Sequence, residues 1–238
     1  MSILQKVYNK FHFPTSDEYI SELKKQGVKI GKRCVIWDPS KTTIDTGRPW
    51  LLEIGDYVKI TAGVVILTHD YSLSVMRRVY GEWLGEGKKT VIGDNVFIGL
   101  NSIILMGSHI GNNVIIGAGS VVRGNIPDNV VIAGNPAKII CSLEEHYNNR
   151  VEKTRIEALQ CARDYYDYYN RAPGINDLLA FKFLFLPRDR DLLNEYGIDF
   201  FCNGDEPSEV EAAFFNSKPI WNGLDELLEE AGIPHTKQ

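Results

Sequence analysis

The sequence predicts a mainly β fold, in which the chain coils around a hydrophobic column and turns a corner every six residues. The first observation is a strict six-residue spacing of aliphatic residues from Ile92 to Val122, in the run IGDNVF, IGLNSI, ILMGSH, IGNNVI, IGAGSV, VRGNIP. The second is an earlier block over 54–71, IGDYVK, ITAGVV, ILTHDY, with the same spacing. Neither the 3.6-residue period of a helix nor the two-residue alternation of a single strand produces this pattern.

Each six-residue unit is expected to supply two inward side chains and one corner. The aliphatic residue that opens a unit points into the coil, and so does the small or β-branched residue four places later. Glycine and asparagine at Gly93, Asn95, Gly111 and Asn113 suit corners that need a left-handed backbone or close packing of chain on chain. Successive coils then pair in parallel at about 4.8 Å. The second set of inward positions is Val58, Val64, Val96, Ser102, Val114 and Ser120.

Helical segments are predicted on both sides of the coil. The segment 15–27 opens with a capping box and ends in glycine, and an amphipathic pattern predicts a further helix over 3–11. After the coil, Ser142 begins a capping-box helix that extends to about Tyr169. The aromatic run FKFLFL (181–186) is either a lipid or partner site or, as we favour, part of a helical core. Further helical patches are expected at 176–186, 188–196, 206–215 and 223–231.

These patterns define three predicted domains: a helical N-terminal segment (1–27), the coil (28–141) with a loop inserted at 72–89, and a C-terminal helical appendage (142–238). Residues 1–141 carry 16 basic against 12 acidic side chains, whereas 142–238 carry 10 against 19. No concentrated basic face appears, so nucleic acid is not an expected partner. The mildly basic first part leaves room for a small polyanion.

The composition, 44% hydrophobic and 24% charged, is that of an ordinary globular protein. No apolar run approaches the ~20 residues that cross a bilayer, and the start MSILQKVYNKF lacks a signal-type apolar block, so we expect a cytoplasmic protein without a transmembrane segment. The four cysteines are scattered with no CxxC pair, which favours reduced thiols.

The run VIGDNVFIGLNSIILMGSHIGNNVIIGAGSVVRGNIPDNVVIAGNPAKII resembles the bacterial hexapeptide-repeat acyltransferases. It is most similar to their sugar O-acetyltransferase branch, which contains galactoside, maltose and capsule-sugar acetyltransferases, and the resemblance covers about 30–140. It implies a left-handed parallel β-helix, acetyl-CoA as co-substrate and a homotrimer. It also implies transfer of an acetyl group to a hydroxyl of a sugar or polysaccharide precursor, directly and without an acyl-enzyme.

His69 is the candidate general base. Acyl transfer from a thioester needs a group that takes the hydroxyl proton, and neutral imidazole has a suitable pKa of about 6.5. His69 ends the unit ILTHDY, immediately before the one long interruption of the repeat. In the family that it resembles, the catalytic histidine lies at the root of such a loop, which reaches toward a neighbouring subunit. The alternative is a corner histidine bonded to its own loop. For His109, which lies at an ordinary corner, a solvated side chain is the favoured interpretation. Only these two histidines lie on the repeat, so no metal site is expected.

Several residues are candidates for binding the acceptor. Asp70 adjoins His69, but neighbours on an extended chain face opposite sides, so the group that orients His69 is left open among Asp70, loop acids and a backbone carbonyl. Glu82 and Glu86 in the loop fold back over the site or are solvated. Tyr71 and Trp83 offer flat faces to a sugar ring or pack the loop. The remaining candidates are Trp37 and Asp38, on the coil where sugar-acetylating relatives carry an acceptor-binding polar residue.

The resemblance also assigns a donor site. The pantetheine arm of coenzyme A is expected along IGAGS and the adenine end along AGNPAK, with Lys138 facing the phosphates and Cys141 at a position that is often basic in relatives. Glycine there permits close backbone approach, although corner sterics explain it equally well. The donor-binding candidates are Leu100, Gly117, Ala118, Arg123 and Lys138.

Two other functions stay open at this point. The acceptor is alternatively an amine, as in nucleotide-sugar N-acetyltransferases, or a xenobiotic compound. In a different class, the coil is a noncatalytic scaffold whose acidic helical tail binds partners. A scaffold would need neither His69 beside a long loop nor the AGNPAK segment.

Overall fold

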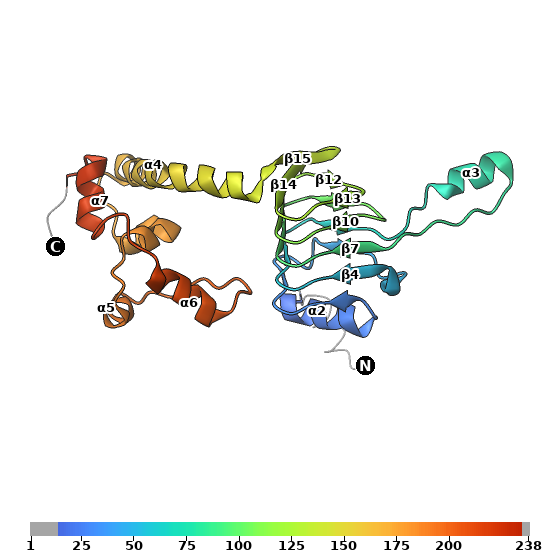
Figure 1. Cartoon of the computed structure of the whole chain (residues 1–238), viewed down its shortest axis with the longest axis horizontal. Helices are drawn as coiled ribbons and strands as arrows, with labels where there is room; N and C mark the ends of the chain where they lie inside the picture. Colours follow the sequence, from blue (N-terminus) through green and yellow to red (C-terminus); the bar gives the residue numbers. More distant parts are fainter. Residues whose placement is uncertain (1–13, 235–238) are drawn as a thin grey trace, which may run out of the picture. The chain divides into compact units, whose positions relative to one another are not determined.

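The computed structural model of the chain describes residues 14–234, and the chain divides into two compact units, Met1–His146 and Tyr147–Gln238 (Figure 1). The helix expected over 3–11 lies outside the described residues, as do His12 and His235. Among the described helices, none combines the length and the apolar character needed to cross a bilayer.

The first unit is a coil of short strands, and the predicted parallel β-helix is confirmed. Successive strands join three sheets in turn, and each strand from β1 to β11 pairs in parallel with the strand three places later (Figure 1). The first sheet contains β1 (Lys29–Ile30), β4 (Leu52–Ile54), β7 (Thr90–Ile92), β10 (His109–Ile110) and β13 (Asn125–Ile126). The second contains β2 (Val35–Ile36), β5 (Lys59–Ile60), β8 (Val96–Ile98), β11 (Val114–Ile116), β14 (Val130–Gly134) and the antiparallel β15 (Ala137–Ser142). The third contains β3 (Thr43–Ile44), β6 (Val65–Ile66), β9 (Ile103–Ile104) and β12 (Val121–Val122).

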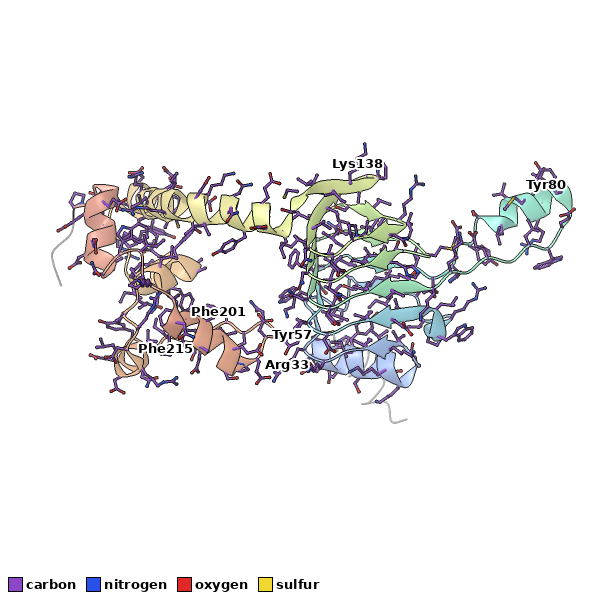
Figure 2. The ribbon with its side chains drawn as sticks, in the orientation of Figure 1. Arg33, Tyr57, Tyr80, Lys138, Phe201 and Phe215 are labelled. Carbon is purple, nitrogen blue, oxygen red and sulfur yellow. The ribbon has the colours of Figure 1, made fainter. Side chains whose placement is uncertain are left out.

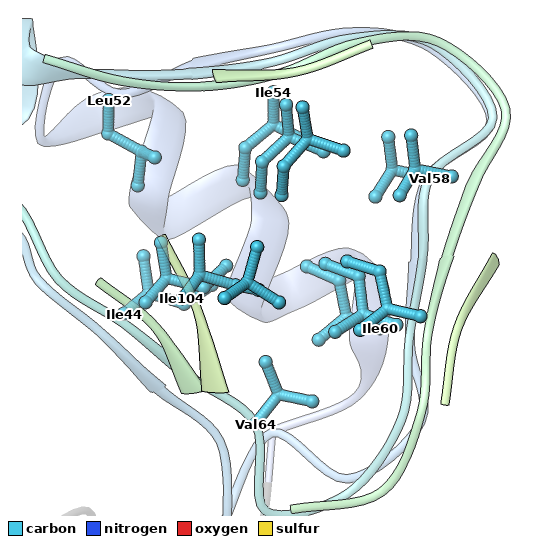
Figure 3. Packing of buried hydrophobic residues seen from close by; sticks show 14 of the residues in the cluster. Ile44, Leu52, Ile54, Val58, Ile60, Val64 and Ile104 are labelled. Atoms are coloured by element: carbon cyan, nitrogen blue, oxygen red, sulfur yellow. The ribbon is translucent and has the colours of Figure 1, made fainter. Parts of the chain in front are cut away.

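The aliphatic residues that open the repeats stack directly on one another. Ile54 pairs with Ile92, and Ile92 pairs with Ile110, so the insertion at 72–89 leaves the register of the coils intact. Figure 3 shows the resulting columns of isoleucine and valine inside the coil. The six residues four places later, including Ser102 and Ser120, are at most 1% exposed, which confirms the predicted inward positions. The two serines bond to Gly117 O from inside the coil, which satisfies their hydroxyl groups.

The corners use asparagine and glycine for two different reasons. Asn95 and Asn113 have φ values of 53° and 55°, in the left-handed region, and the Asn95 side chain donates to Asn113 Oδ1 at 2.9 Å in a ladder along the coil. Gly93 and Gly111 instead sit where a Cβ would collide with the next coil, 2.6 Å from Asn112 Oδ1 in the first case. The glycines therefore set how closely the coils stack.

Two helices and a 3-10 turn accompany the coil. The predicted capping-box helix is α2 (Ser16–Lys25), which buries Ile20 and Leu23 against the first coils. The turn η1 (Pro49–Leu51) precedes β4. The insertion, predicted only as a loop, contains α3 (Leu73–Tyr80), which ends at Gly81 in the left-handed conformation. None of its side chains is buried, so its apolar residues lie on the surface of the described chain.

The second unit is helical. It contains most of α4 (Leu143–Tyr169), whose first turn is capped by Ser142 as predicted, followed by η2 (Ile175–Leu184), α5 (Arg190–Glu195), α6 (Pro207–Asn216) and α7 (Leu224–Ala231). Two buried clusters hold these helices together. Phe185 and Leu186 of the aromatic run are 2% and 1% exposed, so this part of FKFLFL is core.

Candidate active site

The imidazole of His69 lies against a buried carboxylate. His69 follows the end of β6, and Asp45 follows the end of β3, its neighbour in the third sheet, because Ile44 pairs with Ile66. This stacking places His69 Nδ1 2.5 Å from Asp45 Oδ2. The Asp45 side chain is 8% exposed and that of His69 37%. The histidine thus reaches solvent while its partner lies inside the corner.

Asp45 is held in its ionised form. Burial acts to raise its pKa, but hydrogen bonds from the Thr68 hydroxyl, the Gly47 N–H, His69 and the Thr68 N–H together lower the pKa to about 2. An ionised carboxylate only accepts hydrogen bonds, so the proton in the contact belongs to His69 Nδ1. Nε2 of the neutral ring is then left as a hydrogen-bond and proton acceptor. The pair has the arrangement of a general base with its orienting acid.

A pocket of about 320 Å³ opens beside His69, between a corner of the coil and the inserted segment. Arg48 Nη1 donates to the backbone oxygen of Glu86 at 2.6 Å, and Lys88 N–H donates to Thr68 O at 3.1 Å, so both contacts tie the insertion to the coil beside the site. The pocket is lined by Arg48, His69, Asp70, Tyr71, Leu73, Ser74, Arg77, Trp83, Leu84, Gly85 and Glu86.

The structure brings together five of the predicted site residues and separates the other acceptor candidates. His69, Asp70, Tyr71, Trp83 and Glu86 all line the pocket, and the Arg77 guanidinium lies 4.4 Å from the centre of the Trp83 ring. Glu82 is exposed and does not line this pocket.

Trp37 and Asp38 lie away from this pocket as well. They follow β2, at the corner between the second and third sheets, where Trp37 faces the Phe97 ring at 6.4 Å. Asp38 forms an ion pair with Lys41 at 3.0 Å. Within this chain, both residues are therefore separate from His69.

The acid that orients His69 was not among the sequence candidates. Asp70 instead accepts from the Ser72 N–H at 2.6 Å, and this contact with the Ser72 backbone is the main cause of its lowered pKa. Asp45 lies 24 positions before His69, and only the register of the coils connects them. Ile44 pairs with Ile66, so Asp45 has the same position on its coil as Leu67, two residues before His69.

The donor candidates lie on two corners of the coil. Leu100 and Ala118 follow β8 and β11, at the corner between the second and third sheets, where both are exposed. Arg123 follows β12 at the corner where His69 follows β6, and Lys138 is exposed on β15.

The backbone of Gly117 forms hydrogen bonds that hold the coil together. Its N–H donates to Ile132 O, and its carbonyl accepts from Ser102 and Ser120. Within residues 14–234, no three histidine, cysteine or acidic side chains gather closely enough to hold a metal ion.

Comparison with known proteins identifies the family. Residues 89–123 match the family model described as a hexapeptide repeat of succinyl-transferase. The chain is 45% identical over 131 residues to Protein CapG of Staphylococcus aureus, which covers 55% of this chain and 75% of that protein. It is 29% identical over 172 residues to a galactoside O-acetyltransferase of Lactococcus lactis, covering 64% and 79% of the two chains. A solved hexapeptide-repeat-containing acetyltransferase from Vibrio cholerae is 34% identical, with a TM-score of 0.43 over 49% of this chain and 62% of that chain. With CapG matched over three quarters of its length, the chain belongs to the hexapeptide-repeat acetyltransferase family and is an acyltransferase.

Proposed function

We propose that the protein is an acetyl-CoA-dependent O-acetyltransferase that acts on a hydroxyl of a sugar or polysaccharide precursor, with His69 as the general base. The observation that carries this proposal is the contact of His69 with Asp45 where His69 lines a pocket, in a chain of this family. The galactoside O-acetyltransferase among the relatives supports a sugar hydroxyl as the acceptor. Acetyl-CoA is the donor expected for an acetyltransferase, and coenzyme A is the thiol product.

The geometry supports direct transfer to the acceptor, without an acyl-enzyme. His69 Nε2 takes the proton of the acceptor hydroxyl as the oxygen attacks the thioester carbonyl, and Asp45 offsets the positive charge that forms on the ring. When the tetrahedral intermediate collapses, the C–S bond breaks and His69 returns the proton to the sulfur. A thiol has a pKa near 8.5, so the thiolate leaves without a strong acid.

The pocket suits a sugar ring. Tyr71 and Trp83 are 77% and 82% exposed, so each presents an aromatic face to an incoming ring. Flat apolar faces combined with polar groups such as Arg77 and Asp70 match a molecule that carries both C–H faces and hydroxyls.

A homotrimer remains part of the proposal. The helix α3 buries none of its side chains, and Val75, Val79 and Tyr80 are each more than 60% exposed. An amphipathic helix with its apolar side chains in solvent is expected to gain stability from a neighbouring subunit.

The proposed activity is tested by release of free thiol from acetyl-CoA in the presence of a panel of sugars. We expect thiol release with hydroxyl acceptors and an alkali-labile ester product. The panel includes matched amino sugars: if only these are acetylated, the acceptor is an amine and the O-acetyl assignment is wrong. A chain that acetylates no acceptor of either kind would favour the scaffold interpretation.

The donor site gives a second prediction. Lys138 is exposed, and among the described residues no carboxylate lies within 4.0 Å of its ammonium group, so its charge is available to a phosphate. We expect Lys138→Ala to weaken coenzyme A binding about threefold to tenfold in calorimetry, because one charge-assisted contact is lost. The control is Lys25→Ala on α2, an equally exposed lysine far from the AGNPAK segment in sequence. Equal affinity of the Lys138 variant and the wild type would remove Lys138 from the donor site.

A further inference from the structure

The helical unit contains a large groove that the proposed acetyl transfer does not use. Its volume is about 790 Å³, within the range of about 300–1,000 Å³ that is usual for small-ligand sites. All the residues that form it belong to the second unit, in which Figure 2 marks Phe201. It is lined by Tyr147, Arg150, Val151, Thr154, Ala180, Phe183, Leu184, Arg188, Phe200, Phe201, Val210, Phe214, Ser217, Lys218 and Ile220.

The walls of the groove are aromatic. Phe183 and Phe200 stack with their ring centres 5.7 Å apart, and Phe214 meets both rings edge-on at 5.9 and 5.3 Å. Phe201 is 66% exposed at the edge of this cluster. Apolar surface left in water costs about 25 cal/mol per Å², so an apolar ligand that covers these rings is stabilised.

The charges that line the groove are all positive. The segment 147–238 contains 17 acidic and 10 basic residues, yet the lining includes Arg150, Arg188 and Lys218 and no acidic side chain. Arg150 is neutralised by Glu157 through two hydrogen bonds of 2.9 and 2.6 Å. The other two cations have no carboxylate within 4.0 Å in the part of the chain that the structure describes.

The surroundings of Arg188 hold its charge at the groove. Its guanidinium lies 4.1 Å from the centre of the Phe214 ring and donates to Leu186 O and to both oxygens of Ser217. These partners are all neutral, and burial lowers the pKa of the guanidinium. A partly buried cation that meets only neutral partners gains more from an anion than a solvated one does.

Lys182 adds a third cation without a carboxylate partner behind the same rings. The residue is 7% exposed, and its Nζ bonds to Asn176 Oδ1 at 3.1 Å. The same atom lies 5.7 and 5.9 Å from the centres of the Phe183 and Phe201 rings, both of which line the groove. In the described part of this acidic unit, three cations without a carboxylate partner therefore lie at or behind one aromatic surface.

We propose that this groove binds a single-chain lipid with an anionic head group, with its chain along the phenylalanines and its head between Arg188 and Lys218. A peptide fits less well, because Tyr147, Thr154 and Ser217 are the only uncharged polar side chains in the lining, too few to satisfy a buried backbone. The segments 1–13 and 235–238 do not suit the groove either, since they carry lysines and no acidic residues. The site is separate from His69 and does not depend on the proposed activity.

The test uses the full-length protein and dodecyl phosphate below its micellar concentration, titrated by calorimetry. We expect saturable binding of one molecule per chain, at least tenfold tighter than dodecanol, because the neutral alcohol lacks the charge-assisted contacts. Inorganic phosphate is expected to bind far more weakly, because it covers none of the aromatic surface. Equal affinity for all three probes, or no saturable binding of dodecyl phosphate, would overturn the proposal.

Substitutions inside and outside the groove lining test where dodecyl phosphate binds. Lys218→Glu is expected to weaken dodecyl phosphate binding at least tenfold, and Phe201→Ala several-fold; both residues are exposed, so the fold should persist. Lys153→Glu changes the net charge equally at an exposed position outside the lining and is expected to leave the affinity unchanged. If Lys153→Glu weakens binding as much as Lys218→Glu, the attraction is nonspecific and the assignment fails. Tight binding of an acidic peptide with no binding of the lipid would also refute it.

Discussion

Replacing His69 with alanine is expected to lower kcat for acetyl transfer by about 10²–10⁴-fold, the range that general-base catalysis supplies. In the proposed mechanism, His69 Nε2 is the acceptor of the hydroxyl proton, and the nearby Asp45 carboxylate is committed to Nδ1. No other side chain in the pocket combines a neutral, basic nitrogen with this position. The rate is measured as thiol release from acetyl-CoA under saturating acceptor.

The control for this variant is His109→Ala. His109 is an exposed histidine on β10, in the first sheet of the coil, and does not line the pocket. We expect its rate to stay within about twofold of the wild type, with both variants folded by circular dichroism. If the two variants keep similar activity, His69 is not the base, whatever the reaction proves to be.

The coil was predictable because aliphatic residues recur every six positions in the sequence. The spacing from Ile92 to Val122 fixes which side chains point inward, and the structure buries them, including the polar Ser102 and Ser120. The helix α3 was missed although its sequence is amphipathic, because the segment was interpreted only as an interruption of the repeat and Ser72 gives the helix no side-chain cap.

The proposed catalytic pair was only half predictable. His69 stands out because it ends a regular unit directly before an insertion, whereas Asp45 belongs to a stretch in which the aliphatic spacing departs from six: Ile36, Ile44 and Ile54 are eight and ten residues apart. The register of that coil is therefore hidden in the sequence and appears only when β3 is seen to pair with β6. The aromatic groove was hidden in the same way, because its cations come from separate segments of the helical unit.

Asp45→Asn is expected to lower kcat by about 10²–10⁴-fold while the KM values for donor and acceptor stay within about twofold. Asp45 touches neither substrate in the proposed mechanism, so it is a positioning residue that acts through His69. An asparagine can present its NH₂ group to Nδ1, which favours the tautomer with its proton on Nε2 and removes the base. A purely structural role would instead change KM or the folded fraction.

The matched control is Asp70→Asn, at the acid next to His69 in sequence. Asp70 is exposed and bonds to the Ser72 N–H, so we expect less than about a threefold change in kcat. Asp45→Glu keeps the carboxylate but lengthens the side chain and is expected to retain more activity than the asparagine variant. Comparable losses of kcat in the Asp45→Asn and Asp70→Asn variants would contradict the assignment of Asp45, and not Asp70, as the residue that orients His69.

The ionisation of Asp45 also predicts how stability depends on pH. Because the folded state lowers its pKa from 3.8 to about 2, the carboxylate stabilises the fold fully above pH 4, and this contribution is lost as the pH falls from about 4 to 2. The shift in pKa corresponds to a contribution of the Asp45 carboxylate to the free energy of unfolding on the order of 2 kcal/mol. Wild type should therefore exceed Asp45→Asn in urea unfolding at pH 7, and the difference should shrink below pH 4. A stability difference that does not depend on pH would show that the carboxylate is not held ionised by Thr68, Gly47 and His69. The prediction bears on catalysis as well, because the ionised carboxylate is what keeps the proton of His69 on Nδ1.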